Sequence, residues 1–447
     1  MMNIAVVGTG YVGTVSAVGL ASVGHNVVTV DLRKEVVDLI NQGDPHIYEP
    51  GLPELLAKAM ATGNFRATTD LADALQDADV ALIAVGTPSE EGAIDLSQIR
   101  AVSRQIGELL RHRREHLSVV VKSTVLPGTT DTVVKSEIES ASGKGAESFG
   151  LGMNPEFLRE GCAVSDFMNP DRIVLGADDE QTRERLREMY KPWNVDKLEM
   201  STRTAEMVKY ANNCLLATQI SAINELATVA LRVGGIDFRD VVKGVTSDQR
   251  WSPIQPDGSR ISPQILTYLV PGPGFGGSCF PKDVQAMRSF GKAQGLPMGL
   301  LQSVLDINAS QPGEAAHLIE QSGKLGSDSR VLILGMAFKP DTDDLRESVS
   351  LKIAKAFVDA GATVLVHDPV ALETAVAAVP GTRAAADWRQ AVADVDAVVV
   401  ATSWKEYGDL PQVLSDSGKS LRILDARGMF RAADFPGSDY TSFFGKV

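Results

Sequence analysis

The N-terminal segment of this 447-residue chain carries three glycines in the spacing Gly8-x-Gly10-x-x-Gly13. A short apolar run precedes them, a helical pattern over 12–23 follows, and a second apolar run ends at Asp31. Glycines allow a tight turn against a pyrophosphate, the helix start offers N–H groups to it, and a carboxylate ending the second strand accepts ribose hydroxyls. This order of features predicts a βαβ unit that binds a dinucleotide.

Asp31 also bears on which dinucleotide binds. A carboxylate repels a 2′-phosphate, so NAD is favoured over NADP. Arg33 lies two residues further on and is close enough to weaken that discrimination. We therefore predict NAD as the cofactor.

Buried-strand patterns recur at 80–86, 117–124 and 149–156, with helical stretches between them. Strands alternating with helices predict a parallel, doubly wound α/β domain. A second series of the same kind lies at 330–338, 362–369, 396–403 and 421–427.

The stretch between the two series has a different character. It begins with an unbroken helical pattern over 201–231, which Gly234 and Gly235 end. A loop rich in glycine and proline at 252–281 follows, and Pro312-Gly313 is expected to break or restart the helix after it. We predict two Rossmann-like α/β domains joined by a helical middle, with domains at 1–200, 201–322 and 323–447.

Composition excludes several classes of function. A net charge of −14 argues against a nucleic-acid partner. No apolar run is expected to reach the ~18–20 residues that span a bilayer, and the N-terminus enters a strand directly, so we expect a cytoplasmic protein with no membrane partner. The three cysteines are too few and too dispersed for a disulfide framework or a zinc site, and we expect no metal.

One cysteine lies in a loop that suggests chemistry. The segment PGPGFGGSCFPKD at 271–283 presents Cys279 beside Lys282 and Asp283. A thiolate is the reactive form of cysteine, and nearby cations or a helix N-terminus favour it. By composition alone a cysteine in a glycine-rich turn is more often structural. Cys214, inside the helical pattern, is expected to be a packed core thiol.

Two polar pairs have helical spacing. Lys209 and Asn213 are four residues apart on the predicted central helix, so they project from one face and could stabilise a developing oxyanion. Taken alone, Lys209 is more often a solvated surface residue. Glu156 and Glu160 also lie four apart; such a pair is usually a solvated helix face, but here it follows a predicted strand, where ligands bind in open α/β sheets.

Six motifs, in order along the chain, closely resemble the UDP-glucose/GDP-mannose dehydrogenase family. They are GTGYVG (8–13), STVLPGT (123–129), NPEFLREG (154–161), EMVKYANN (206–213), PGPGFGGSCFPKD (271–283) and FKPDTDDLRES (338–348). The resemblance spans nearly the whole chain and reverses the structural interpretations of Cys279 and Lys209. It implies an NAD domain, a helical middle that forms a homodimer or a higher oligomer, and a C-terminal domain that binds the nucleotide sugar.

The resemblance also implies a reaction. The primary alcohol at C6 of a nucleotide sugar loses a hydride to NAD, and Cys279 adds to the aldehyde to form a thiohemiacetal. A second oxidation leaves a thioester, which water hydrolyses to the carboxylate. Lys209 and Asn213 would stabilise charge on oxygen, while Asp283, Thr124 and Glu156 would position water or move protons.

Binding roles follow from the same resemblance. The residues expected at the cofactor are Gly8, Gly10, Tyr11, Val12, Gly13, Asp31, Arg33, Thr87, Thr124, Glu160 and Arg346. Those expected at the nucleotide sugar are Glu156, Phe157, Leu158, Lys209, Asn213, Arg250, Arg260, Tyr268, Phe275, Gly276, Phe338, Lys339 and Arg427.

The chain departs from the family pattern in two places. The family usually has a lysine or arginine five residues after the ribose-binding acid; here Val36 stands there, and Arg33 or Lys34 would have to substitute. The family's Asp-x-Arg segment is matched by Asp248-Gln-Arg250, but about a dozen extra residues separate it from the cysteine loop, as the printed sequence shows. Arg260 could equally be the displaced partner. The insertion either reshapes sugar selection or is a harmless surface excursion.

The substrate is less constrained than the reaction. The cysteine loop is most like that of UDP-glucose dehydrogenases, whereas STVLPGT is also similar to the GDP-mannose branch, so UDP-glucose is favoured and GDP-mannose is second. Two other classes remain open: a two-electron dehydrogenase of the β-hydroxyacid type, which lacks a nucleophilic cysteine, and a non-catalytic sensor of nucleotide sugars.

Overall fold

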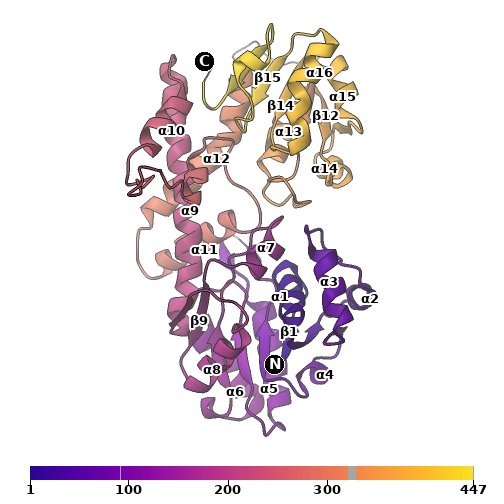
Figure 1. Ribbon diagram of the computed structural model, residues 1–447, viewed down its shortest axis with the longest axis vertical. Coiled ribbons are helices and arrows are strands. Elements are labelled where there is room, and N and C mark those ends of the chain that lie inside the picture. The colour runs from indigo at the N-terminus through magenta and orange to yellow at the C-terminus, as the bar shows by residue number, and fades with distance from the viewer. Residues whose placement is uncertain (91, 321–328, 446–447) are drawn as a thin grey trace. The chain divides into compact units, whose positions relative to one another are not determined.

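The computed structural model describes residues 1–90, 92–320 and 329–445, and the chain forms two compact units, Met1–Asn212 and Asn213–Val447 (Figure 1). The expected boundary between 322 and 323 lies outside the described residues. The division into three domains stays a prediction.

The first unit is built on an eight-stranded sheet in which nearly all neighbours are parallel. The six strands from β3 to β8 follow the order of a dinucleotide-binding fold. In this order the chain adds strands to one side of β1 and then, starting with β4, to the other side. In sheet order the strands are β3 (Phe65–Thr68), β2 (Asn26–Val30), β1 (Asn3–Val7), β4 (Val80–Ile83), β7 (Ser118–Val121), β8 (Gly150–Met153), β9 (Ile173–Ala177) and β10 (Lys197–Met200). A small hairpin of β5 (Ser89–Glu90) and β6 (Ala93–Ile94) stands apart from this sheet.

Helices connect these strands, and Figure 1 shows them labelled around the sheet. Apolar side chains from the helices pack with fully buried strand residues such as Ile4 and Leu82 in two clusters. The helical segments are α1 (Tyr11–Ser22), α2 (Lys34–Gln42), α3 (Leu52–Ala61), α4 (Leu71–Leu75), α5 (Ser97–Leu110), η1 (Thr129–Val134), α6 (Lys135–Ser142), η2 (Ala146–Ser148), α7 (Ala163–Met168) and α8 (Glu180–Met189).

Two strands, β9 and β10, run opposite to the other strands of this sheet. β9 runs antiparallel to β8, with Met153 opposite Gly176. The connection between them contains only a loop and the six-residue α7, and it does not cross back to the other edge of the sheet. The chain therefore turns back at the carboxyl edge of the sheet.

The predicted central helix is continuous. α9 runs from Thr202 to Val233, and Gly234 and Gly235 end it with φ values of +75° and +66°. By length and apolar composition alone α9 could cross a membrane, although 39% of its most apolar 18-residue window is buried within the protein. The expectation that no apolar run reaches this length was therefore wrong for α9.

The second unit begins with helices. They are the remainder of α9, α10 (Phe238–Thr246), η3 (Gln264–Leu269), α11 (Phe280–Ala293) and α12 (Gly299–Glu320).

The expected break at Pro312 was wrong, because α12 continues through it to Glu320. A proline inside a helix removes a hydrogen bond and costs ~3 kcal/mol. Beyond Pro312, however, Ala315, Leu318 and Ile319 are buried in a core cluster with the strands of the second sheet. Burial of these side chains offsets the cost of the proline.

The second sheet is fully parallel and has six strands. In sheet order they are β13 (Thr382–Ala384), β12 (Thr363–His367), β11 (Arg330–Leu334), β14 (Ala397–Val400), β15 (Arg422–Asp425) and β16 (Asp439–Ser442). The order repeats that of the first sheet. The accompanying helices are α13 (Val349–Asp359), α14 (Leu372–Ala378), α15 (Trp388–Ala391), η4 (Val392–Asp394), η5 (Lys405–Asp409), α16 (Leu410–Ser417) and η6 (Ala432–Asp434).

Candidate active site

The three glycines after β1 have different structural roles. Gly8 has φ +103°, and a Cβ there would lie 2.7 Å from the carbonyl oxygen of Ala84. A Cβ on Gly13 would lie 1.9 Å from the carbonyl oxygen of Gly8, so the helix packs directly on the loop. At Gly10, by contrast, a Cβ would meet no atom of the described chain within 4 Å. This open backbone is where a pyrophosphate can approach.

The start of α1 is suited to an anion. Gly10 precedes the helix, and the described residues place neither a capping side chain nor an acid in its first turn, which begins with Tyr11 and Val12. Unpaired N–H groups and the positive end of the helix dipole favour a phosphate there. The loop therefore fits NAD.

The expected ribose-binding acid lies at the end of β2. Asp31 accepts a hydrogen bond from the Thr9 hydroxyl and is held by the Arg33 guanidinium, with Nε 3.0 Å from Oδ1 and Nη2 3.1 Å from Oδ2. Burial alone would raise the pKa of Asp31, but the hydrogen bonds from Arg33 and Thr9 outweigh it, and the pKa falls well below its usual range.

The missing basic residue of the family pattern has a structural explanation. Val36 lies on the buried face of α2 and packs into the core. Lys34 pairs with Asp38 on the surface, so Arg33 is the cation that reaches Asp31.

The loop after β8 brings Glu156 to a buried lysine. Lys209 Nζ lies 2.7 Å from Glu156 Oε1, and the two residues are 3% and 7% exposed. Glu156 Oε2 accepts from the Leu158 backbone N–H at 2.6 Å. Burial would raise the pKa of Glu156, but Lys209 and the more distant Lys122 lower it overall. Lys209 is thus a buried ion-pair partner rather than a solvated surface residue.

Other expected residues of the first unit lie close by in the sheet connections. The Thr87 hydroxyl donates to the backbone carbonyl of Thr124 at 2.9 Å, linking the segments after β4 and β7. The Phe157 ring lies 4.0 Å from the Arg172 guanidinium carbon. Glu160 ends the same loop as Glu156, and this segment is irregular rather than helical.

In the second unit, Cys279 is the residue that precedes α11. Its carbonyl accepts the N–H of Asp283 at 2.8 Å, and its Sγ lies 3.7 Å from the Ser278 hydroxyl. The positive end of the α11 dipole favours a thiolate at this position over a thiol.

Asp283 lies one turn into α11 and is 1% exposed. Asn213 Nδ2 donates to one of its oxygens at 2.7 Å, and Lys282 Nζ lies 2.6 Å from the other. Lys209 and Asn213 are one turn apart on α9. That helix therefore carries both the lysine bound to Glu156 and the amide bound to Asp283.

The glycines of the cysteine loop pack against the segment after β11. Gly277, at φ +80°, donates its N–H to the Arg346 carbonyl at 2.9 Å. A Cβ on Gly276 would lie 2.3 Å from the Glu347 carbonyl oxygen. The Arg346 side chain is exposed and pairs with Asp344.

The other two thiols lie in different surroundings. Cys214 is buried, and burial, with the Asp283 charge adding, raises its pKa to about 12. The expectation of a packed core thiol is confirmed. Cys162 is exposed.

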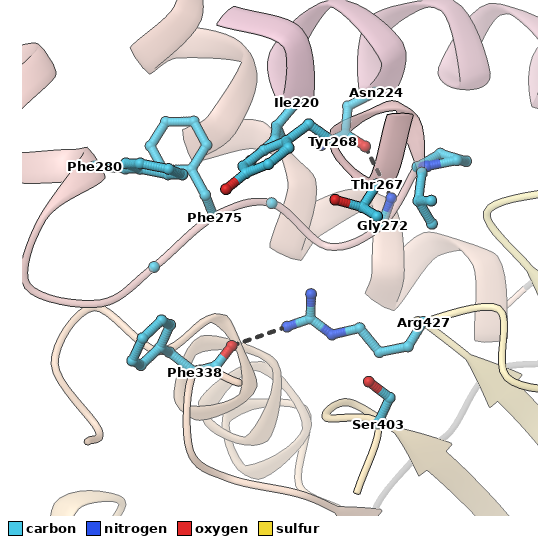
Figure 2. A pocket seen from close by; sticks show the side chains of 14 residues that line it. Ile220, Asn224, Thr267, Tyr268, Gly272, Phe275, Phe280, Phe338, Ser403 and Arg427 are labelled. Atoms are coloured by element: carbon cyan, nitrogen blue, oxygen red, sulfur yellow. Dashed lines mark hydrogen bonds between the residues drawn. The ribbon is translucent and has the colours of Figure 1, made fainter. Parts of the chain in front are cut away.

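A cavity of about 340 Å³ lies beside the cysteine loop, between the helices and the second sheet of this unit. Figure 2 shows the rings of Tyr268, Phe275 and Phe280 on one side and Arg427 on the other, with its guanidinium toward Phe338. Arg427 Nε donates to the Ala401 carbonyl at 2.7 Å, and burial lowers the pKa of its guanidinium to about 10. Lys339 lies next to this cavity, with Nζ 5.5 Å from the Phe338 ring centroid.

The insertion before the cysteine loop folds back on itself. Arg260 Nη1 donates to the carbonyls of Ser247 and Ser252 at 2.7 and 3.3 Å. The Arg250 side chain is 84% exposed and pairs with Asp248. Neither arginine reaches the cavity described above, whose lining residues do not include them.

Three sequence models of one family match the chain. The NAD-binding domain of the UDP-glucose/GDP-mannose dehydrogenase family matches residues 2–194, its central domain 203–310 and its UDP-binding domain 332–432. The chain belongs to the UDP-glucose/GDP-mannose dehydrogenase family. It is therefore an NAD-dependent oxidoreductase with the predicted arrangement of two α/β regions and a helical middle.

Individual relatives agree with this placement. The chain is 39% identical to the UDP-glucose 6-dehydrogenase AglM of Haloferax volcanii, covering 99% of this chain and 100% of that protein. It is 38% identical to the GDP-mannose 6-dehydrogenase of Azotobacter vinelandii over 82% of this chain and 81% of that one. The solved UDP-glucose dehydrogenase of Pyrobaculum islandicum is similar with a TM-score of 0.89 and 38% identity, covering 100% and 98% of the two chains.

The sequence patterns did not predict two residues that lie near the candidate site. His46 Nε2 lies 2.7 Å from the Thr9 carbonyl oxygen, beside the cofactor loop. Lys122 is buried immediately before the STVLPGT motif. Its position at the end of an apolar strand was the available signal, because a charged residue is rarely buried without a role.

Proposed function

We propose that this protein oxidises the C6 alcohol of UDP-glucose to the carboxylate of UDP-glucuronate, with two NAD reduced per sugar and Cys279 as a covalent nucleophile. The observation that carries the proposal is the position of Cys279 at the start of α11, one turn before a buried Asp283 that Asn213 holds. A simple hydroxyl dehydrogenase has no need of a thiol in such a setting.

The first unit would hold NAD through the Gly8–Gly13 loop, the start of α1 and Asp31, with Thr87, Thr124 and Glu160 as further contacts. Arg346, a residue of the second unit, would be one more contact. NAD, when bound, supplies the oxidising capacity by accepting a hydride from C6 in each oxidation. The buried Lys209–Glu156 pair would take up the proton of the C6 hydroxyl and stabilise charge on its oxygen.

The covalent steps would fall to Cys279. Its thiolate adds to the C6 aldehyde, and the resulting alkoxide takes a proton to give a thiohemiacetal. The second oxidation converts this into a thioester. Water, positioned by Asp283 with Thr124 and Glu156, then attacks the acyl carbon, releases the carboxylate and returns the thiol. Asn213 would donate to the oxygen that carries negative charge in both steps.

The cavity beside the cysteine loop would receive the nucleotide. Aromatic rings of Tyr268, Phe275 and Phe338 offer faces for a base or a sugar, and Arg427 offers positive charge for the diphosphate. Phe157, Leu158, Gly276 and Lys339 would complete the contacts. Arg250 and Arg260 do not line this cavity, so their contact with the nucleotide sugar stays a prediction.

UDP-glucose is favoured because relatives named UDP-glucose 6-dehydrogenases match almost the whole chain, whereas the GDP-mannose 6-dehydrogenases match 82% of it. GDP-mannose is the second candidate. We further propose three domains, at 1–200, 201–322 and 323–447, and a cytoplasmic homodimer or higher oligomer. The dimer is supported by the exposed apolar residues of α9, among them Leu215, Leu226, Val229 and Val233.

Stoichiometry tests the mechanism. With limiting UDP-glucose, the wild-type enzyme should form two NADH per sugar at completion. Cys279→Ala should lose four-electron turnover by at least ~10³-fold, because the covalent intermediate cannot form. Cys162→Ala, which removes an exposed thiol, is the matched control and should retain activity.

One NADH per sugar, or full turnover by Cys279→Ala, would support a two-electron dehydrogenase instead. A panel of UDP-glucose, GDP-mannose and UDP-N-acetylhexosamines ranks the substrates by kcat/KM. No NADH from any of them would favour a non-catalytic sensor.

A further inference from the structure

Lys122 is a buried cation that the proposed reaction does not use. It follows the last residue of β7, two residues before Thr124, and is 3% exposed. Placing an ammonium group away from water is unfavourable unless other groups compensate it. Its surroundings therefore indicate what it does.

The ammonium group is hydrogen-bonded to the loop after β8, which carries Glu156. Lys122 Nζ donates to Asn154 Oδ1 at 2.8 Å, and the Tyr190 hydroxyl donates to the same oxygen. Asn154 Nδ2 in turn donates to the Val174 carbonyl of β9 at 2.9 Å. Asn154 is thereby fixed from three sides, and only Pro155 separates it from Glu156.

Aromatic rings cover the rest of the group. Nζ lies 6.0 Å from the Phe167 centroid and 5.9 Å from the Tyr190 centroid, within the range of a cation–π interaction. No carboxylate of the described residues lies within ion-pair distance of Lys122. Its charge is instead compensated at longer range.

The groups that act on it from neighbouring elements are Glu156, after β8, and Lys209, on α9. Burial lowers the pKa of Lys122 to about 8; Glu156 opposes the shift and Lys209 adds to it. One buried carboxylate thus lies within the field of two buried ammonium groups. When all three are ionised, this group of residues carries a net positive charge.

We propose that Lys122 is a positioning residue for the oxidation, which orients Glu156 through Asn154 and keeps the Glu156 carboxylate ionised while it is paired with Lys209. This rests on the proposed function, in which the Glu156–Lys209 pair handles the hydroxyl proton. The second positive charge acts because Coulomb interactions are stronger in the water-poor interior. A protonated Glu156 would lose its ionic attraction to Lys209 and could not take up the hydroxyl proton.

Removing the charge should change the pH profile in one direction. In Lys122→Gln, which keeps an N–H donor for Asn154, the carboxyl of Glu156 loses a favourable positive charge and protonates more easily. The fall of kcat on the acid side should therefore move to higher pH, by ~1 unit. KM for NAD should stay unchanged, because Lys122 does not touch the cofactor loop. Lys122→Arg should restore the wild-type acid side.

Three further variants separate charge from orientation and from folding. Lys122→Met removes both charge and donor, and serves if the glutamine variant does not fold. Tyr190→Phe removes the hydroxyl that donates to Asn154 and accepts from Lys122 Nζ at 3.4 Å, but it keeps the charge, so it should lower kcat without moving the acid side. Lys191→Met removes an exposed lysine one residue further on, 73% exposed in its ion pair with Glu188, and should behave as wild type.

The proposal would be overturned if the acid-side fall of kcat stayed at its wild-type pH in both Lys122→Gln and Lys122→Met. It would also be overturned if Tyr190→Phe moved that fall by the same amount. In either case, a wild-type protein that remains active leaves the proposed function intact. A wild-type protein that forms no NADH from any nucleotide sugar would overturn both.

Discussion

Six strands of the first α/β sheet have the same order as the six strands of the second, but the loop after the first strand is arranged differently in the two. In each, a glycine with positive φ ends that strand: Gly8 at +103° and Gly335 at +88°. In each, an aspartate follows the second strand: Asp31 and Asp368. The two sheets differ in what that aspartate binds.

In the first sheet, Asp31 accepts hydrogen bonds from the side chains of Thr9 and Arg33 and from their backbone N–H groups, at 3.4 and 2.9 Å, but the backbone around Gly10 stays open. In the second sheet, Asp368 is 2% exposed, and its Oδ2 accepts the loop N–H groups of Met336 and Ala337 at 2.8 and 2.9 Å. The loop amides that could bind a phosphate are thereby satisfied within the protein. Strand order alone therefore does not make a dinucleotide site, because the loop must also leave space at the helix start, as it does at Gly10.

Filling the open loop should have the largest effect. Gly10→Val places methyl groups where the pyrophosphate must approach, so NAD affinity should fall by at least ~100-fold. Because no atom of the described residues lies within 4 Å of a Cβ at this position, the urea unfolding midpoint should change little. Fluorescence titration with NAD measures the first and urea unfolding the second.

Gly13→Ala provides the contrast, because its Cβ would collide with the Gly8 carbonyl and should destabilise the fold. If Gly10→Val bound NAD as wild type does, the cofactor would not approach this loop and the comparison would fail.

Exchanging the two aspartates for asparagine should give opposite results. Asp368→Asn leaves buried backbone N–H groups poorly satisfied and should reduce the free energy of unfolding by ~3 kcal/mol, with NAD affinity unchanged. Asp31→Asn should weaken NAD by ~10-fold or more with a smaller loss of stability. Calorimetry of thermal unfolding, combined with NAD titration, measures both. Equal effects on stability from the two variants would contradict the distinction.

The smallest expected effect concerns Arg33. Its side chain is 54% exposed, so its pair with Asp31 contributes little to stability. Arg33 is also the nearest cation for a 2′-phosphate. Arg33→Ala should lower kcat/KM for NADP by ~5-fold and change that for NAD less.

Lys34→Ala, which breaks only the surface pair with Asp38, is the control for Arg33. If Arg33→Ala lost more kcat/KM with NAD than with NADP, Arg33 would act on the ribose hydroxyls and not on a 2′-phosphate.

Much of the fold could be predicted from local patterns. The βαβ unit at Gly8 and the long helix α9 both follow from apolar periodicity and glycine placement. Strands such as β3 and β10 were missed because their sequences, FRAT and KLEM, are short and lack a continuous apolar run. The path of α12 through Pro312 was missed because packing, rather than propensity, decided it.

The candidate site divides in the same way. Spacing placed Lys209 and Asn213 on one face of a helix, and the motif order named Cys279. That Glu156 binds Lys209 and that Asn213 binds Asp283 depends on contacts between residues 53 and 70 positions apart, which no local pattern reports.

The sequence by itself therefore determined the family, the cofactor loop and the residue types available for chemistry, because these depend on spacing within one or two turns of chain. The tertiary structure alone decided which charges are buried and which are paired. It left Gly10 open, closed the corresponding loop with Asp368, and buried Lys122 behind the Glu156–Lys209 pair. Burial and long-range pairing set these differences, because the same residue types in water would be solvated and largely independent of one another.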